Sequence, residues 1–197
     1  MDAITLLKND HRTVEGLFKK YEATGDRAHK TRRTLVDTII RELSIHAAIE
    51  EQVFYPGARS AAKGATDLVL ESLEEHHIVK WTLSELQDMD PTDERFHPKV
   101  TVLMESVRHH VKEEEQELFP KVRTALSRSA LQDLGERMEA AKLIAPTRPH
   151  PRAPDEPPGN VVAGAAAAAV DAGKDMVTGV VQAVRGRDRR SARLNPG

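Results

Sequence analysis

One motif occurs twice in this sequence, and it constrains the fold more than any other feature. The two copies read HAAIEEQVFYP from residue 46 and HVKEEEQELFP from residue 110, so they are 64 residues apart. Each copy contains a histidine, a glutamate four residues later, an apolar pair and a proline. A duplicated unit of two helices would produce such a repeat, so we expect the chain to fold as two equivalent halves.

A second pair of matching segments supports this duplication. His11 is followed by a valine after three residues and by an apolar residue after seven, and His76 shows the same pattern at an offset of 65. Each half would therefore contain one helix with a single histidine and one helix with the longer motif.

Apolar residues recur at the spacing of an α-helix through the first 144 residues, and strand patterns are absent. Asp2 is the expected cap of the first helix, and Pro56 and Pro120 should kink or divide the second and the fourth. Four long helices with short connections favour an all-α fold, an antiparallel up-down four-helix bundle with Trp81 in its core. The long helices are expected at residues 3–24, 28–63, 66–88 and 94–126, with a short fifth helix ending near residue 143.

The composition changes near residue 145, and this change divides the chain into three parts. Residues 1–144 form the expected bundle. Residues 145–160 form an expected Pro-rich linker, because six of the fourteen residues from 146 to 159 are proline, which favours extended backbone. Residues 161–197 form an Ala/Val-rich and then basic tail that is expected to be flexible or weakly helical. Through residues 161–193 the tail is expected to make at most a weak contact with a partner or a membrane surface.

Charge and cysteine content exclude several classes of function. The net charge of −2 provides no overall field that would attract nucleic acid, so no nucleic-acid partner is expected. The absence of cysteine excludes disulfides, thiolate metal sites and thiol nucleophiles. The N-terminus lacks a signal-peptide pattern, and no long apolar run precedes residue 160, so we expect a cytoplasmic protein without a transmembrane segment. The expected state is a monomer or a homodimer.

The spacing inside the repeated motif is that of a metal site. On a helix, His46 and Glu50 share one face, as do His110 and Glu114, and the apolar stripe of each helix runs through them. A single copy would be read as a hydrogen bond on a helix surface. Two copies that point into one bundle would bury carboxylates and imidazoles at a cost that metal ions would offset.

Two further histidines, His11 and His76, complete the set of four histidines and two glutamates. The glutamates would bridge two metals, and the histidines would fill the terminal positions. Nitrogen and oxygen ligands without thiolate suit two non-haem iron ions best, with manganese or zinc as alternatives.

These residues resemble the signature of the hemerythrin-like (HHE cation-binding) family. The resemblance covers about residues 1–125 and includes the endings of both motif copies. It implies a four-helix bundle with a non-haem di-iron centre that interacts with O2, peroxide or NO, or that senses iron. The implied metal ligands are His11, His46, Glu50, His76, His110 and Glu114.

The sequence departs from the oxygen-carrying hemerythrins at one position. Those proteins have two histidines four residues apart on the third helix, whereas here Lys80 follows His76 and Ser72 precedes it. One metal would therefore keep an open position, which favours chemistry over storage. We expect a catalase-like reaction with hydrogen peroxide, or a reaction with O2 or NO, in oxidative stress. The alternative is an O2 or iron sensor or carrier without turnover.

Three more residues are expected beside the ligands. Tyr55 stands between motif residues, where it could fill the open position or tune the site. His77 and His109 adjoin the proposed ligands, and the choice between His76 and His77 as the ligand stays open. Solvated charge, rather than a ligand role, is expected for Glu51, Glu113 and Glu115.

Overall fold

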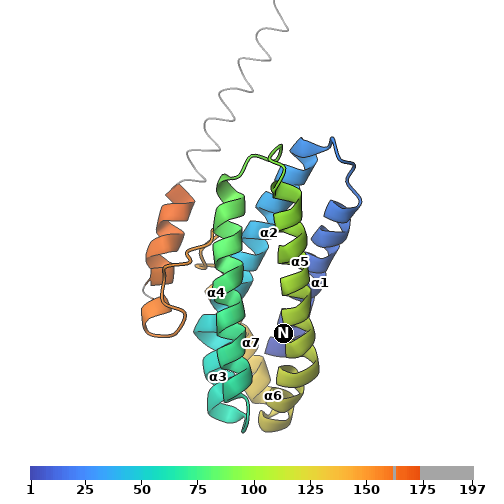
Figure 1. Ribbon diagram of the computed structural model, residues 1–197. Coiled ribbons are helices and arrows are strands. Elements are labelled where there is room, and N and C mark those ends of the chain that lie inside the picture. The colour runs from blue at the N-terminus through green and yellow to red at the C-terminus, as the bar shows by residue number, and fades with distance from the viewer. Residues whose placement is uncertain (162, 174–197) are drawn as a thin grey trace, which may run out of the picture.

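The computed structural model describes residues 1–161 and 163–173 of the chain (Figure 1). Within these residues the chain forms helices and loops and no strand, so the prediction of an all-α fold is confirmed. The α-helices are α1 (Ala3–Glu22), α2 (His29–Ile49), α3 (Tyr55–Ala61), α4 (Thr66–Asp88), α5 (Phe96–Glu113), α6 (Phe119–Ala125) and α7 (Arg128–Lys142).

The four long helices α1, α2, α4 and α5 build a bundle in which the chain runs alternately up and down (Figure 1). The short helices α3 and α6 continue α2 and α5 at one end, where α7 packs against α1 and α2. Asp2 begins α1 as predicted, because its Oδ1 accepts a hydrogen bond of 3.0 Å from the amide of Thr5. Gly135 lets α7 approach the N-terminus, since a Cβ atom there would lie 2.1 Å from the carbonyl oxygen of Met1.

Two wide π-helical turns separate α2 from α3 and α5 from α6. They span Glu50–Phe54 and Glu114–Leu118, and in each the amide of the following residue bonds to the carbonyl five residues earlier. Pro56 and Pro120 come directly after these turns, in the first turn of α3 and α6. Proline lacks an amide hydrogen, so it cannot donate the backbone bond that an α-helix requires at its position. The wide turn accommodates this missing bond. The predicted division of both helices therefore occurs just before each proline.

Two apolar clusters fill the bundle and leave a polar layer between them. Along α1, for example, His11 lies between Leu7 of one cluster and Val14 of the other. The prediction that Trp81 belongs to the core is wrong, because its side chain is 42% exposed. The inward face of α4 instead carries Leu83, two residues further on, where the helical turn points it into the bundle.

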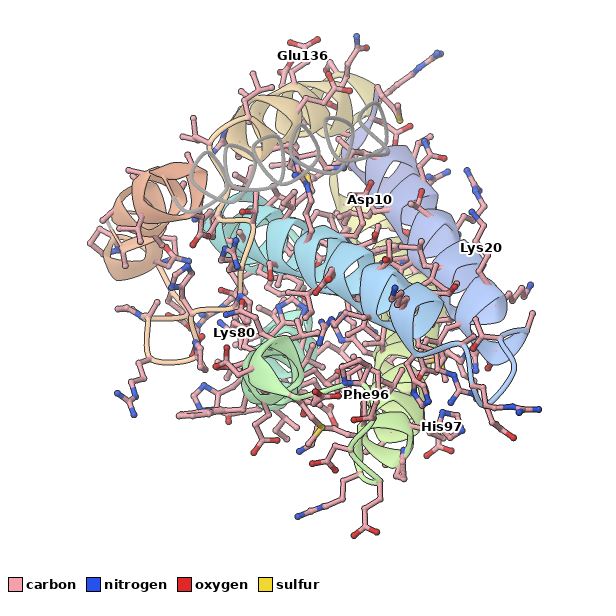
Figure 2. The ribbon with its side chains drawn as sticks, turned by 90° about the horizontal axis from the view of Figure 1, so that it is seen from above. Asp10, Lys20, Lys80, Phe96, His97 and Glu136 are labelled. Carbon is pink, nitrogen blue, oxygen red and sulfur yellow. The ribbon has the colours of Figure 1, made fainter. Side chains whose placement is uncertain are left out.

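The chain after α7 returns along the bundle. Residues 159–161 and 163–173 are helical and lie beside the end of α2 (Figure 2), where a Cβ atom at Gly164 would lie 2.7 Å from the side chain of Gln52. Asp171 is fully buried, and its Oδ2 accepts hydrogen bonds from the amides of Thr147 and Arg148. These bonds connect Thr147 and Arg148, near the start of the chain after α7, to the helix that contains Asp171. The predicted tail beyond residue 173 lies outside the described residues.

None of the helices in the described ranges has both the length and the apolar content that crossing a bilayer requires.

Candidate metal centre

The six predicted ligands converge in the polar layer between the two apolar clusters. Each of the long helices brings one histidine, and the two π-helical turns bring the glutamates at their first residues. All six side chains belong to residues that are at most 5% exposed. They are His11 on α1, His46 on α2, His76 on α4, His110 on α5, and Glu50 and Glu114 in the turns.

The cluster consists of two overlapping groups. One contains His11, His46, Glu50 and Glu114, the other contains Glu50, His76 and His110, and the ligand atoms of each group lie within 4.8 Å of one another. Glu50 Oε2 lies 3.2 Å from His46 Nε2 and 3.4 Å from His76 Nε2. Glu114 Oε2 lies 3.4 Å from His11 Nε2 and 3.6 Å from His110 Nε2. Each glutamate therefore reaches a histidine of both groups.

Several inward atoms of the cluster have no hydrogen-bond partner among the described residues. They are Nε2 of His11 and His46, Oε1 of Glu50 and Oε2 of Glu114. A buried polar atom without a partner costs about 1–3 kcal/mol, so four of them in one place are unfavourable in a purely structural core. A cation would take up these lone pairs, and the imidazole and carboxylate donors suit iron, manganese or zinc. The six side chains of the cluster therefore have the chemistry needed to hold these metal ions.

A carboxylate faces the outer nitrogen of every histidine in the cluster. The distances from Nδ1 to the carboxylate oxygen are 2.9 Å from His11 to Glu115, 3.6 Å from His46 to Asp10, 3.1 Å from His76 to Glu51 and 2.7 Å from His110 to Glu75. A carboxylate at Nδ1 keeps the proton on that nitrogen and leaves the Nε2 lone pair directed to the centre. Histidines that bind metals have this arrangement.

Lysines hold three of these carboxylates from outside. Lys8 Nζ lies 3.1 Å from Glu115, Lys142 Nζ lies 2.6 Å from Asp10, and Lys80 Nζ lies 3.0 Å from Glu51. Figure 2 shows Asp10 on the α7 side of α2, whereas Lys80 lies on the α4 side. Each of these three histidines is thus held by a chain of two charged side chains.

Burial and neighbouring charge separate the pKa values of the two glutamates. Burial and the adjacent Glu114 raise the pKa of Glu50 well above its ordinary value. Burial also acts to raise the pKa of Glu114, but the neighbouring histidines, His110 first, outweigh it and hold that pKa below its ordinary value. Burial lowers the pKa of His46 to about 4 and also lowers that of His76, so both rings are neutral near pH 7.

Tyr55 lies inside the cluster. Its hydroxyl oxygen is 3.1 Å from Glu114 Oε1, 3.3 Å from His76 Nε2 and 3.5 Å from Glu50 Oε2. Burial, together with the charges of Glu114 and Glu50, raises the pKa of Tyr55 well above its ordinary value. The phenol therefore stays protonated and donates to the carboxylates.

A small cavity of about 20 Å³ adjoins all four histidines of the cluster. A site needs about 10–15 Å³ to hold one water molecule, so this cavity admits a molecule of roughly that size. Its remaining walls are apolar and consist of Val14, Leu43, Ala47, Val79, Val107 and Val111.

The other two histidines predicted beside the ligands lie away from the cluster. The His77 side chain is 42% exposed, and its Nε2 accepts a hydrogen bond of 3.1 Å from Trp81 Nε1. The His109 side chain is 62% exposed and lies beside Glu113. The structure therefore brings His76, and not His77, to the other candidate ligands.

The expectation that Glu51 is a solvated charge is wrong, because Glu51 is only 6% exposed. It lies between His76 and Lys80, since the wide turn directs both Glu50 and the next residue inward. Glu115 is also wrongly predicted, because it contacts His11.

Sequence reasoning missed the four carboxylates that hold the histidines. A signal for them exists, because an acidic residue precedes each single histidine and another follows the glutamate of each motif copy. The pattern does not reveal which histidine each one contacts, since the contact partner in every case lies on a different helix.

Comparison with known proteins identifies similar chains. The family model of the hemerythrin HHE cation-binding domain matches residues 2–122. An uncharacterised hemerythrin-like protein of Schizosaccharomyces pombe is 31% identical over 169 residues, which are 85% of this chain and 82% of that protein. Because 85% of the chain is covered, this match extends beyond α7.

Two further matches are more distant or partial. The crystal structure of a hemerythrin HHE cation-binding domain-containing protein from Mycobacterium kansasii has a TM-score of 0.63 and 26% identity, covering 73% of this chain and 86% of that one. A DNA nickase of a Nostoc species is 29% identical over 143 residues, which are 72% of this chain but only 39% of the nickase.

Proposed function

The chain belongs to the hemerythrin HHE cation-binding family, and on that premise we propose that it is a non-haem di-iron protein that reacts with hydrogen peroxide, O2 or NO. The observation that carries this proposal is the buried cluster of four histidines and two glutamates whose inward atoms lack partners. Such a cluster is unfavourable without cations and well suited to hold two of them.

Each metal would have its own histidines and share the glutamates. His11 and His46 would hold one metal ion, and His76 and His110 would hold the other, because these pairs belong to separate groups. Glu50 and Glu114 would bridge the two ions, since each reaches a histidine of both groups. Bound iron would supply one-electron chemistry that no side chain of this chain can supply.

The residues around the centre would limit what reaches it. The cavity beside the histidines has room for one small molecule, and its apolar walls exclude bulky or charged substrates. Peroxide, O2 and NO fit this size. Tyr55 can donate a hydrogen bond to Oε1 of Glu114 and thereby hold a proton within the cluster that would bind the metal ions.

Metal analysis of the purified full chain is the first test. After anaerobic loading with Fe²⁺ and removal of excess metal, we expect about two iron ions per chain. A variant with Glu114→Ala should lose iron, while Glu117→Ala, which changes an exposed glutamate of the same turn outside every candidate metal group, should retain it. Fewer than one iron per wild-type chain would rule out the di-iron proposal.

Turnover is tested separately from metal binding. We propose catalase-like activity, so the iron-loaded protein should release O2 from added hydrogen peroxide, and Glu114→Ala should release far less. Iron binding without turnover would instead support the alternative function as an O2 or iron sensor. One observation favours this alternative: the contacts from His76 continue through Glu51 and Lys80 to a segment outside the bundle.

A further inference from the structure

We propose that Asp155, in the segment after α7, is a positioning residue for the half of the centre that contains His76. This inference rests on the proposed function, because it assigns a role toward a metal ion that the cluster would bind. It concerns a part of the chain beyond the residues that the family model matches.

An unbroken series of contacts joins Asp155 to the cluster. The Asp155 carboxylate pairs with Lys80 Nζ, and Lys80 Nζ lies 3.0 Å from Glu51 Oε1 and 3.2 Å from Glu51 Oε2. The same Oε1 of Glu51 lies 3.1 Å from Nδ1 of His76. Lys80 is 8% exposed and Glu51 is 6% exposed, so solvent screens these contacts little.

The segment that carries Asp155 is anchored to the bundle at several other points. Glu156 pairs with Arg59 of α3 at 2.8 Å. The carbonyl oxygen of Asn160 accepts a hydrogen bond of 3.4 Å from Gln52, and Asn160 Nδ2 donates to the carbonyl of Asp155 at 3.1 Å. Asn160 is only 4% exposed. These contacts place the Asp155 carboxylate at Lys80 without relying on the ion pair alone.

The arrangement around His76 differs from those around the other histidines. Lys8 and Lys142 hold the carboxylates of His11 and His46 from within α1 and α7. Lys80 occupies the position four residues after His76, and it contacts a second carboxylate from outside the bundle. Docking of this segment therefore affects the half of the centre that contains His76 more directly than the half that contains His11 and His46.

The physical effect runs through the orientation of Glu51. With Asp155 present, Lys80 is held between two carboxylates, and its ammonium fixes the Glu51 carboxylate against His76. Without Asp155, the flexible side chain of Lys80 can turn toward solvent, and Glu51 loses its cation. Groups that orient a metal-binding histidine typically change metal affinity by about 10–100-fold when they are lost.

The test is a Co²⁺ titration of the full-length chain by calorimetry, with the d–d absorption of the bound ion recorded in parallel. Asp155→Ala should weaken one of the two equivalents about tenfold and change its spectrum, while the other equivalent stays as in the wild type. Glu156→Ala is the matched control, because it removes the adjacent ion pair between the same segment and the bundle but has no contact to Lys80 among the described residues. It should leave both equivalents unchanged.

A double-mutant cycle tests whether Asp155 acts through Lys80. Lys80→Met alone should weaken the same equivalent by a similar factor, and adding Asp155→Ala should weaken it no further. If Asp155→Ala does not yield folded protein, Lys80→Met carries the same expectation. Equal weakening by Asp155→Ala and Glu156→Ala, additive effects in the cycle, or unchanged binding in Asp155→Ala would each overturn the inference. A wild type that binds no Co²⁺ would instead reject the proposed function.

Discussion

Replacing Glu50 by glutamine should stabilise the metal-free protein and abolish its response to metal, two effects of opposite sign. In the metal-free protein Glu50 is fully buried beside Glu114, and its Oε1 has no hydrogen-bond partner among the described residues. Glutamine has nearly the same shape, carries no charge, and can donate its amide hydrogens to the Glu114 carboxylate. Relieving an unpartnered buried oxygen is worth about 1–3 kcal/mol. For a chain of this size, the metal-free Tm should rise by about 2–12 °C.

Metal binding should raise the Tm of the wild type by more than Glu50→Gln raises the Tm of the metal-free protein. A ligand at about a thousand times its Kd adds about 4 kcal/mol to folding stability, which corresponds to about 8–16 °C in Tm. Glu50 belongs to both candidate groups, so the glutamine variant should lose most of this gain. A bundle whose cluster binds no metal would show no rise in Tm on adding metal, in the wild type or in Glu50→Gln.

The assay is thermal unfolding by circular dichroism under anaerobic conditions, with and without Fe²⁺. The wild type, Glu50→Gln and Glu71→Gln are compared, and the last variant changes an exposed glutamate on α4 as a control. The reasoning is refuted if Glu50→Gln lowers the Tm of the metal-free protein, or if that variant keeps the full rise in Tm on adding Fe²⁺.

Three further predictions follow from the same geometry. His110→Ala should bind about one iron instead of about two, measured by elemental analysis, because only the group with His76 is lost; loss of both ions would contradict separate groups. Because the folded pKa of Glu50 is raised, its contribution to stability is complete below the unfolded value near 4.3 and is lost as pH rises through the folded pKa. His46 and His76, whose pKa values are lowered by burial, act in the opposite direction over the same range. The urea midpoint of the metal-free protein should therefore fall relative to that of Glu50→Gln as pH rises from 5 to 8, and a constant difference between the two would contradict this prediction. Val79→Phe should fill the cavity and slow peroxide turnover about tenfold or more without changing iron content, and an unchanged rate would show that substrate does not enter there.

The repeated motif, together with the matching segments around His11 and His76, was enough to predict the fold class and the six residues of the cluster. A histidine and a glutamate four residues apart share a helix face in any α-helix, so the apolar stripe that runs through His46 and Glu50 already indicates that both point inward. The same logic applies to the second copy. Short loops between four long amphipathic helices leave few arrangements other than a bundle.

The contacts around the cluster could not be predicted, because they depend on departures from regular helix geometry and on long-range packing. The wide turn that begins at Glu50 directs Glu51 inward, whereas regular spacing predicts solvent exposure. The exposure of Trp81 was missed because neighbouring Leu83 faces the core. Docking of the segment after α7 rests on isolated polar residues such as Asn160 and Asp171, and an Ala- and Pro-rich composition gives no sign of their burial.

The carboxylates that follow the motif glutamates are exchanged between the two halves of the chain. Glu51 of the first half contacts His76 of the second, and Glu115 of the second contacts His11 of the first. Reciprocal contacts of this kind are those of a two-fold symmetric homodimer. The two halves of this chain therefore hold the cluster together in the manner of two subunits, each of which completes the site of the other. This correspondence between the halves is broken at Lys80, whose counterpart in the first half is Glu15.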